Sequence, residues 1–561
     1  MKIVERPYSE ADRRMLLEAG VHPLLARIYA ARRIRTPSEL KYEASGLLAP
    51  RFLKSIDEAA ALLADAIQAG KRMLIIADYD ADGATACAVG IRALRMFGAQ
   101  VDYLVPDRFK LGYGLSPELV ELAAERKPDL LITVDNGIAS VEGVARARAL
   151  GIQTLITDHH LPGPELPAAA CIVNPNQPGC EFPSKALAGV GVMFYAMLAL
   201  RAELRRRGSF AGKPEPNLGV LTDLVALGTV ADVVPLDANN RNLVSQGLKR
   251  LRAGRGQPGV IALLRAAGRQ LGEASGFDLG FVAGPRLNAA GRLADMSLGI
   301  ECLITDDEAR AMNLASELDK LNAERRSIEA SMLEQGLQLL KDVRADSGLT
   351  FFDPTWHQGI VGILASRLKD RIHRPVICFA PAQESGRPVL RGSGRSIAGL
   401  HLRDCLDLVA KRSPGLITRF GGHAMAAGLT VPEAHYELFA QAFEAAVGEL
   451  LPAEARHRTV ETDGALDGAH FTLEVARMLD GEIWGQGFPQ PVFCDNFVVE
   501  GQRVVGEKHL KLRLVKDGRR YEAMRFGALE ALPEKIRAAY RLTLNEFNGL
   551  KNIQLNVEHF E

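Results

Sequence analysis

The chain reads LIIADYDADG over residues 74–83, an apolar run that ends in three aspartates and a glycine. The apolar part predicts a buried strand, and alternation along an extended backbone would put Asp78, Asp80 and Asp82 on one side of it. Three carboxylates this close together raise one another's pKa and destabilise the fold unless a cation neutralises them. Hard oxygen ligands suit Mg²⁺ or Mn²⁺. We interpret the stretch as part of a metal site, with a solvated acidic turn as the alternative.

Two further apolar runs end in polar residues that can bind metals. Residues 130–134 and 155–157 are expected to be buried strands, followed by Asp135-Asn136-Gly137 and by Asp158-His159-His160. Helical segments separate these strands, and this alternation predicts a parallel sheet with helices on both faces. Ligands of such sheets bind beyond the carboxyl ends of the strands. We therefore expect the three polar clusters to meet at one edge of the sheet.

A fourth apolar segment, residues 224–235, contributes one more acid, Asp232. Taken alone, that residue would more often be a helix or turn residue than a ligand, but its place after the other clusters favours a ligand. Two divalent ions about 3.5–4 Å apart, bridged by a carboxylate, promote displacement at phosphorus. Asp135 is the expected bridge, and His160 is expected to act as a hydrogen-bond donor or acid. The ligands expected for such a pair are Asp80, Asp82, Asp135, His159 and Asp232.

Composition limits the class of protein and the kind of partner. A chain of 561 residues is expected to form two to four domains. Lys plus Arg and Asp plus Glu both number 68, so any polyanion must be held by a local basic groove. The seven cysteines are scattered and contain no CxxC pair, which favours a reducing compartment. Because no apolar run approaches the ~20 residues that span a bilayer, we predict a cytoplasmic protein.

The four acidic clusters resemble, in order and spacing, the motifs of the DHH phosphoesterase superfamily. Many members of that superfamily carry a histidine four residues before the aspartate that Asp80 resembles, whereas this chain has Ile76. The resemblance therefore implies one ligand too few for one of the two ions. Asp78 is the candidate replacement.

The half of the chain that follows carries further recognisable segments. Residues 284–292 (GPRLNAAGR) are interpreted as a glycine-bounded turn, and residues 306–343 as one long helix or two nearly collinear ones. Three glycine-rich segments come next, at 356–367, 391–396 and 420–428, and we interpret them as turns whose Arg, Ser and His donors suit phosphate oxygens. The last contains GGHAMAAG, which resembles the signature of the DHHA1-type substrate-binding domain that accompanies many DHH proteins.

The last hundred residues alternate apolar with polar side chains in five short runs separated by turns. This pattern predicts a small barrel of the oligonucleotide-binding (OB) type. Its lysines, arginines and phenylalanines could form a groove that tracks a nucleic-acid backbone and stacks bases. An ordinary solvated barrel face is nearly as compatible with these residues.

The expected fold class is α/β: a parallel-sheet DHH domain, a long helical connector, a second α/β domain of DHHA1 type and a C-terminal OB-like β-barrel. The boundaries expected for these parts, with an N-terminal helical cap in front, are 1–50, 51–300, 301–345, 346–458 and 459–561.

This domain order resembles the bacterial single-strand-specific exonucleases of the DHH superfamily. The resemblance implies 5′→3′ degradation of single-stranded DNA in recombination and repair, with two Mn²⁺ or Mg²⁺ ions in each active site. It also suggests a single-strand-binding protein and a RecQ-type helicase as protein partners. The residues expected to grip the DNA backbone or terminal phosphate are Arg108, Arg286, Asn288, Arg367, Ser393, Arg395 and His423.

Two other functions compete with this interpretation. A DHH phosphodiesterase or pyrophosphatase acting on short oligonucleotides, cyclic dinucleotides or pyrophosphate would share the two core domains, but the long connector and the barrel favour a polymer. An inactive DNA-binding scaffold would not need every carboxylate, whereas here each metal position except Ile76 carries a ligand type.

Overall fold

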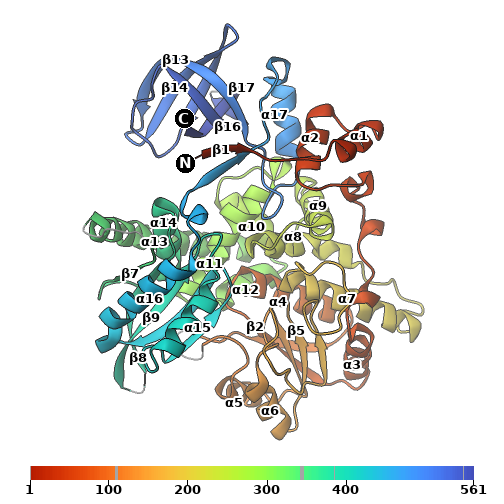
Figure 1. The fold of residues 1–561 in the computed structure, drawn as a ribbon. Coiled ribbons are helices and arrows are strands. Elements are labelled where there is room, and N and C mark those ends of the chain that lie inside the picture. Colours follow the sequence, from red (N-terminus) through yellow and green to blue (C-terminus); the bar gives the residue numbers. More distant parts are fainter. Residues whose placement is uncertain (1, 108–111, 342–346, 385, 548) are drawn as a thin grey trace. The chain divides into compact units, whose positions relative to one another are not determined.

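A computed structural model describes residues 2–107, 112–341, 347–384, 386–547 and 549–561 (Figure 1). The chain forms two compact units. The larger unit contains Glu5–Asn322 and Thr462–Phe560, and the smaller one contains Met1–Val4, Ala323–Glu461 and Glu561.

The larger unit is built on a five-stranded sheet in which every pair of neighbouring strands is parallel. Its strands, in spatial order, are β3 (Gln100–Leu104), β2 (Arg72–Ala77), β4 (Leu130–Val134), β5 (Gln153–Thr157) and β6 (Cys171–Val173). The predicted strands β2, β4 and β5 are confirmed, while the two edge strands, which have fewer buried residues, were not predicted. Because β2 pairs with β3 on one side and with β4 on the other, the strand order reverses at β2, where ligands of open α/β sheets bind.

Helices cover both faces of this sheet, as the alternation of strands and helices predicted. Ile75 and Ile132 belong to one apolar cluster, with residues of α4 (Ala81–Met96) and α7 (Gly189–Arg206). Leu74 and Leu131, the neighbouring residues on the same strands, belong to a separate cluster that includes side chains from α5 and α6. Figure 1 shows α5 (Pro117–Ala124) and α6 (Val141–Ala149) side by side. Burial on both sides explains why these strands are almost entirely apolar.

Further helices complete this part of the larger unit: α1 (Glu10–Glu18), α2 (Pro23–Ala31), α3 (Ile56–Gln68), α8 (Thr222–Ala231), α9 (Ala238–Arg252), α10 (Pro258–Ala266), α11 (Gly284–Leu293) and α12 (Ser297–Ile304). The interpretation of residues 284–292 as a turn was wrong, because they form α11. Pro285 lies in its first turn, where a missing N–H costs nothing. A Cβ on Gly284 would lie 3.0 Å from the Cβ of Ala231, so this glycine serves close packing rather than a turn.

The predicted long helix is confirmed over its described part as α13 (Glu308–Lys341). Residues up to Asn322 belong to the larger unit, and residues from Ala323 belong to the smaller one. Within the residues that the structure describes, no helix is long and apolar enough to cross a membrane.

The smaller unit contains a mixed five-stranded sheet in the order β10-β11-β9-β8-β7. The strands are β7 (Leu349–Phe352), β8 (Val376–Glu384), β9 (Arg387–Arg395), β10 (Arg419–Gly422) and β11 (Ala426–Pro432). Helices α14 (Val361–Ile372), α15 (Leu402–Arg412) and α16 (Tyr436–Leu450) accompany the sheet, and β1 (Lys2–Glu5) pairs with β12 (Thr459–Thr462) in a separate two-stranded sheet.

The three glycine-rich segments of the smaller unit are not simply turns, so that interpretation was wrong. Residues 361–367 lie in α14, residues 391–395 lie in β9, and 420–428 form most of the β10–β11 hairpin. A Cβ on Gly392 would lie 2.5 Å from the Phe379 ring, and one on Gly394 would lie 2.8 Å from Leu402. These glycines make room for neighbouring side chains instead of bending the chain.

The C-terminal part of the chain forms a closed barrel, which confirms the five predicted strands. The order is β13 (Phe493–Val505), β14 (His509–Lys516), β15 (Arg519–Arg525), β17 (Leu550–Phe560) and β16 (Lys535–Phe547). All neighbours are antiparallel except β15 and β17. One helix, α17 (Leu473–Gly481), precedes the barrel and was not predicted.

Candidate metal centre

The acids of the opening stretch come together through a helix cap rather than through strand alternation. Strand β2 ends at Ala77, and Asp80 is the N-cap of α4. Its Oδ1 accepts hydrogen bonds from Asp82 N at 2.9 Å and from Gly83 N at 3.0 Å. Asp82 therefore lies in the first turn of a helix, and the predicted alternation was wrong. A Cβ at Gly83 would lie 2.6 Å from the Asp78 carbonyl oxygen, so this tight turn requires glycine.

Asp82, in the first turn of α4, is buried and its carboxylate faces the N-terminus of α7. Its Oδ2 accepts a hydrogen bond from Gly189 N at 2.7 Å, and its Oδ1 accepts one from Val190 N at 2.8 Å. The free N–H groups at a helix N-terminus favour a carboxylate. Burial and the neighbouring charge of Asp80 outweigh these bonds and raise the pKa of Asp82 to about 7. The hydrogen bonds from the protein therefore do not fully offset the cost of burying an ionised Asp82 carboxylate.

Asp135 follows β4 with a left-handed backbone, at φ 63°. Its N–H donates to Thr157 O at 3.0 Å, while the amide of Asn136 donates to Ile76 O at 3.1 Å and ties the turn to β2. A Cβ on Gly189 would lie 2.7 Å from Asp135 Oδ1, so only glycine lets α7 begin this close to the carboxylate. Asp135 Oδ1 is buried and accepts no hydrogen bond from the described residues.

The two histidines after β5 are oriented by the aspartate that precedes them. Asp158 Oδ1 accepts hydrogen bonds from the backbone N–H groups of His159 and His160, at 2.7 and 3.1 Å. The same oxygen lies 2.8 Å from His160 Nδ1. Burial would lower the pKa of His160, but Asp158 and the other nearby carboxylates raise it to about 9. Burial would raise the pKa of Asp158, yet its partners, His160 first, hold that pKa below its ordinary value.

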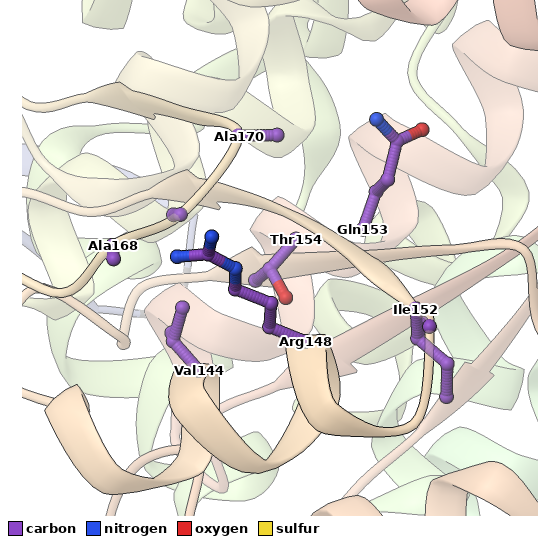
Figure 2. Close-up of a pocket in the computed structure, with 9 residues that line it drawn as sticks. Val144, Arg148, Ile152, Gln153, Thr154, Ala168 and Ala170 are labelled. Carbon is purple, nitrogen blue, oxygen red and sulfur yellow. The ribbon is translucent and has the colours of Figure 1, made fainter.

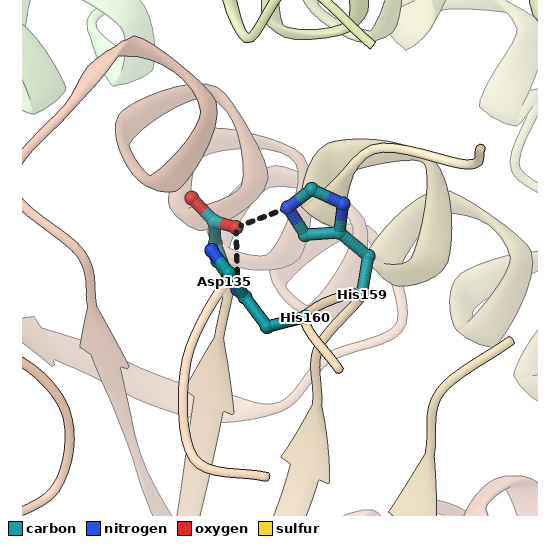
Figure 3. Close-up of side chains that lie close together, drawn as sticks. All are labelled: Asp135, His159 and His160. Carbon is teal, nitrogen blue, oxygen red and sulfur yellow. Dashed lines mark ion pairs between the residues drawn. The ribbon is translucent and has the colours of Figure 1, made fainter. Parts of the chain in front are cut away.

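Both imidazoles point toward Asp135 (Figure 3). His159 Nε2 lies 3.1 Å from Asp135 Oδ1, and His160 Nδ1 lies 3.9 Å from the same oxygen. His159 Nε2 also lies 3.5 Å from Asp232 Oδ2. Asp232 is the C-cap of α8. This helix can pack close to the site because Gly228 has no side chain; a Cβ there would lie 2.9 Å from Asp82 Oδ1.

The side chains of this centre form three overlapping groups in which possible ligand atoms all lie within 4.8 Å of one another. The groups are Asp78, Asp80 and Asp135; Asp135, His159 and His160; and Asp82, His159 and Asp232. The pKa values of Asp135 and Asp232 are raised well above their ordinary range. Burial is the larger cause, and repulsion from neighbouring carboxylates is the smaller one. Carboxylate and imidazole donors with uncompensated charge fit divalent cations such as Mn²⁺ or Mg²⁺.

Three family models match the chain. Residues 72–229 match the DHH family N-terminal domain, residues 346–449 the DHHA1 domain, and residues 462–559 the RecJ OB domain. The single-stranded-DNA-specific exonuclease RecJ of Dickeya dadantii is 50% identical to this chain, and the match covers 99% of this chain and 98% of that protein. The chain belongs to the RecJ family. The protein of the same name from Escherichia coli is 48% identical, with 98% of each chain covered.

Solved RecJ structures agree with the fold. The crystal structure of RecJ from Thermus thermophilus in complex with Mn²⁺ matches with a TM-score of 0.82 and 31% identity, over 100% of this chain and 79% of that one. The Mg²⁺ complex of the same protein matches with a TM-score of 0.77 and 30% identity, over 100% and 78% of the two chains. The predicted order of DHH domain, helical segment, DHHA1 domain and OB barrel is confirmed.

Of the predicted substrate-binding residues that the structure describes in this RecJ-family chain, two lie in the larger unit. Asn288 Oδ1 accepts a hydrogen bond from Ala81 N at 2.8 Å, which places the amide directly against the acidic loop. Arg286 donates to Val282 O at 2.7 Å and forms a 2.7 Å ion pair with Asp319 of α13.

The other predicted substrate-binding residues that the structure describes lie in the smaller unit. Arg395, on β9, donates to Ser393 Oγ at 3.1 Å, and its burial lowers the pKa of the guanidinium. Arg367, on α14, forms a 2.8 Å ion pair with Glu329, and His423 is exposed in the β10–β11 connection. Arg108 lies outside the described residues.

Sequence reasoning missed several polar residues that hold the histidine turn. Tyr113 Oη lies 3.1 Å from both Asp135 O and His160 Nδ1. The amides of Asn174 and Asn176 donate to His160 O and His159 O, at 3.0 and 2.6 Å. The two glycines that flank Tyr113 were the only sequence feature that could have drawn attention to it. In the structure both Gly112 and Gly114 have positive φ.

Figure 2 shows a separate hollow, lined in part by Gln153 and Thr154 at the start of β5, whereas the histidines follow the end of that strand. Its volume is about 560 Å³, and its lining combines small apolar residues with the polar side chains of Arg148, Gln153 and Thr154. We assign it no function, because none of the predicted site residues lines it.

Proposed function

We propose that this protein is a metal-dependent exonuclease that degrades single-stranded DNA from 5′ to 3′ into mononucleotides, in recombination and repair. The single-strand-specific activity named for its RecJ relatives supports this proposal. The cluster of carboxylates and imidazoles at the switch point of the sheet supplies the chemistry.

One observation carries the proposal: Asp135 belongs to two of the three possible ligand groups. We propose that it bridges two divalent ions. The other proposed ligands are Asp78, Asp80, Asp82, His159 and Asp232. When bound, such a pair of ions provides a nucleophile at neutral pH and neutralises charge on the phosphodiester.

Asp78 takes the role that a histidine at position 76 would have. Ile76 is fully buried in the apolar cluster under α5 and α6, so its side chain belongs to the core. Asp78 is also buried, but its carboxylate lies within 4.8 Å of ligand atoms of Asp80 and Asp135. In this proposal Asp78, two residues further along the chain, supplies the metal ligand that position 76 lacks.

The remaining residues of the centre orient the ligands and handle protons. Asp158 holds the His160 ring through the 2.8 Å contact at Nδ1, and we propose that His160 donates a hydrogen bond or a proton to phosphoryl oxygens. Asn136 fixes the turn that carries Asp135, and Asn288 holds the acidic loop at Ala81. These contacts keep the ligands in place before any ion or substrate binds.

We extend the proposal to the substrate contacts. The residues proposed to bind the DNA backbone or the terminal phosphate are Arg108, Arg286, Asn288, Arg367, Ser393, Arg395 and His423, because guanidinium, amide, hydroxyl and imidazole groups donate hydrogen bonds to phosphate oxygens. The exposed cations of the barrel, among them Lys508 and Arg519, are proposed to hold the following nucleotides.

We also propose a setting for this activity. No disulfide joins any of the seven cysteines in the part of the chain that the structure describes, which fits the reducing bacterial cytoplasm. A single-strand-binding protein and a RecQ-type helicase are the proposed protein partners, since they coat and supply the substrate strand. The proposed domain boundaries lie near residues 50, 300, 345 and 458.

A digestion assay tests the proposed function. Single-stranded DNA, duplex DNA and a dinucleotide, each labelled at the 5′ end, are incubated with Mn²⁺, Mg²⁺ or a chelator. The expected result is release of labelled mononucleotide from the single strand only when a metal is present. Activity confined to the dinucleotide would contradict the proposal, and so would hydrolysis that survives the Asp135→Asn substitution.

A further inference from the structure

Two phenylalanines project from the protein surface at the π-helix that precedes α11. The rings of Phe277 and Phe281 stack with centroids 5.0 Å apart and planes 21° apart, and the side chains are 57% and 72% exposed. They lie four residues apart at the π-helix Asp278–Ala283, whose Leu279 and Val282 point into the core. Single apolar residues on a surface need no explanation, but a stacked aromatic pair on the outer side of a helix does.

The π-helix packs against the end of the helix that carries Asp232. A Cβ on Gly280 would lie 3.0 Å from Val230 Cγ1, and one on Gly284 would lie 3.0 Å from Ala231 Cβ, which is next to Asp232. The π-helix continues into α11, whose Asn288 accepts a hydrogen bond from Ala81 N in the acidic loop. Along the helix, Phe281 and Asn288 are separated by a rise of about 10 Å. Short π-helical segments of this kind occur often at functional sites.

Cationic side chains accompany the pair. The Arg269 guanidinium lies 6.0 Å from the Phe277 ring centre and forms a 3.2 Å ion pair with Asp278. Arg252 donates to Ala274 O at 2.8 Å, three residues before Phe277. Lys551 of barrel strand β17 forms a 3.0 Å ion pair with Glu273. The segment before the π-helix therefore contacts the barrel, and the Arg269 guanidinium lies beside the aromatic pair.

We propose that Phe277 and Phe281 form a base-stacking platform for the single-stranded DNA substrate, located between the barrel and the metal centre. Phe281 is the more exposed of the two and would receive a base, while Phe277 stacks against its other side. Every base presents a π-face, so this contact tolerates all sequences, and nearby cations can bind the adjoining phosphates. The inference deepens the proposed nuclease function and rests on it, because it assigns a binding site to the same substrate.

Binding measurements with the full chain test the platform. Fluorescence anisotropy of labelled single-stranded DNA, in chelator and at fixed salt, gives the dissociation constant without hydrolysis. Phe281→Ala and the double variant Phe277→Ala/Phe281→Ala are expected to bind roughly 5- to 150-fold more weakly, the fold-change that corresponds to the loss of one stacked base. Phe281→Trp is expected to retain affinity. Leu122→Ala, which truncates an exposed apolar residue on α5, serves as the matched control and is expected to bind as the wild type does.

Substrates with one altered nucleotide show whether stacking causes the loss. A strand scanned with 2-aminopurine is expected to show quenching at one or two positions after the second nucleotide from its 5′ end, and Phe281→Ala is expected to remove it. An abasic site at those positions is expected to weaken binding by the wild type but not by Phe281→Ala. If an abasic site weakens binding equally in the wild type and in Phe281→Ala, the platform is overturned. It is also overturned if the double variant binds and quenches as the wild type does, a result that would leave the surface to a protein partner.

Hydrolysis of a 5′-phosphorylated dinucleotide separates this inference from the proposed function. Phe281→Ala is expected to cleave it at the wild-type rate, because so short a strand ends before the platform. If the wild type cleaves no single-stranded DNA, the proposed function fails, whatever the stacking results. If the wild type cleaves normally and the Phe variants bind and quench as it does, only the platform fails.

Discussion

Asp158 Oδ1 lies 2.8 Å from His160 Nδ1, while Asp158 Oδ2 accepts a hydrogen bond from Ile138 N at 2.9 Å. The carboxylate thus holds the imidazole and the neighbouring turn together. Asp158→Asn removes the charge and should lower the rate of hydrolysis by about 10- to 100-fold, the usual effect of losing a partner of this kind. Steady-state kinetics on single-stranded DNA measures the change.

The matched control for that prediction is Asp404→Asn. Asp404 also contacts a histidine, His401, at 3.3 Å, but this pair is exposed at the start of α15. The control should hydrolyse DNA at the wild-type rate. A wild-type rate for Asp158→Asn would show that His160 needs no such support.

Gly189→Ala should damage the metal centre by steric means alone. The new Cβ would lie 2.7 Å from Asp135 Oδ1, so either the carboxylate or the start of α7 must move. We expect metal-dependent stabilisation, measured as the rise in melting temperature on adding Mn²⁺, to be largely lost. Gly468→Ala is the control, because its Cβ would meet nothing within 4 Å. An unchanged Mn²⁺ response in Gly189→Ala would mean that Asp135 is not a ligand.

Asp223 provides a pH-dependent test of the core. Burial raises the pKa of this carboxyl, at the start of α8, to about 6, although Gln257 N donates to its Oδ2 at 2.5 Å. Because the folded-state pKa is raised, ionisation destabilises the fold, and stability falls as pH rises from about 4 to about 6. Relative to wild type, Asp223→Asn should gain up to about 3 kcal/mol between pH 4 and pH 7.5. Denaturant unfolding at both pH values measures the gain, and a constant difference between the proteins would refute it.

Removing one partner of the buried ion pair between Arg32 and Asp463 should strongly destabilise the fold. Both side chains are buried, and the guanidinium donates to the two carboxylate oxygens at 2.6 and 3.1 Å. Asp463→Ala leaves the Arg32 charge buried and should lower the free energy of unfolding by about 3–5 kcal/mol. Glu449→Ala, which breaks an exposed pair with Arg412, should cost less than about 1 kcal/mol. Similar losses in the two variants would contradict this ranking.

The sequence predicted the central strands, the long helix and the barrel, and the strands were predictable because buried parallel strands are continuously apolar. The structure also brings the predicted acids and histidines close together, while their role as metal ligands stays a prediction. The manner in which the acids meet was not predictable from spacing alone, since β2 ends at Ala77 and Asp80 caps α4.

Glycine was the main source of error. Gly284 and Gly392 looked like turn residues, but they lie in a helix and in a strand, where their missing Cβ makes room for Ala231 and Phe379. Such close approaches are tertiary contacts that no local pattern contains. Tyr113 and Asn174 were missed for the same reason, because their roles depend on His160 and Asp135, which are distant in sequence.

The most direct test of the central claim is the stoichiometry of Mn²⁺ binding, measured by titration calorimetry together with electron paramagnetic resonance. The wild type should bind two ions per chain and show a spin-coupled signal, because Asp135 joins them. Asp135→Asn should lose that coupling and at least one of the ions. A single bound ion in the wild type, or an unchanged coupled pair in Asp135→Asn, would contradict the account.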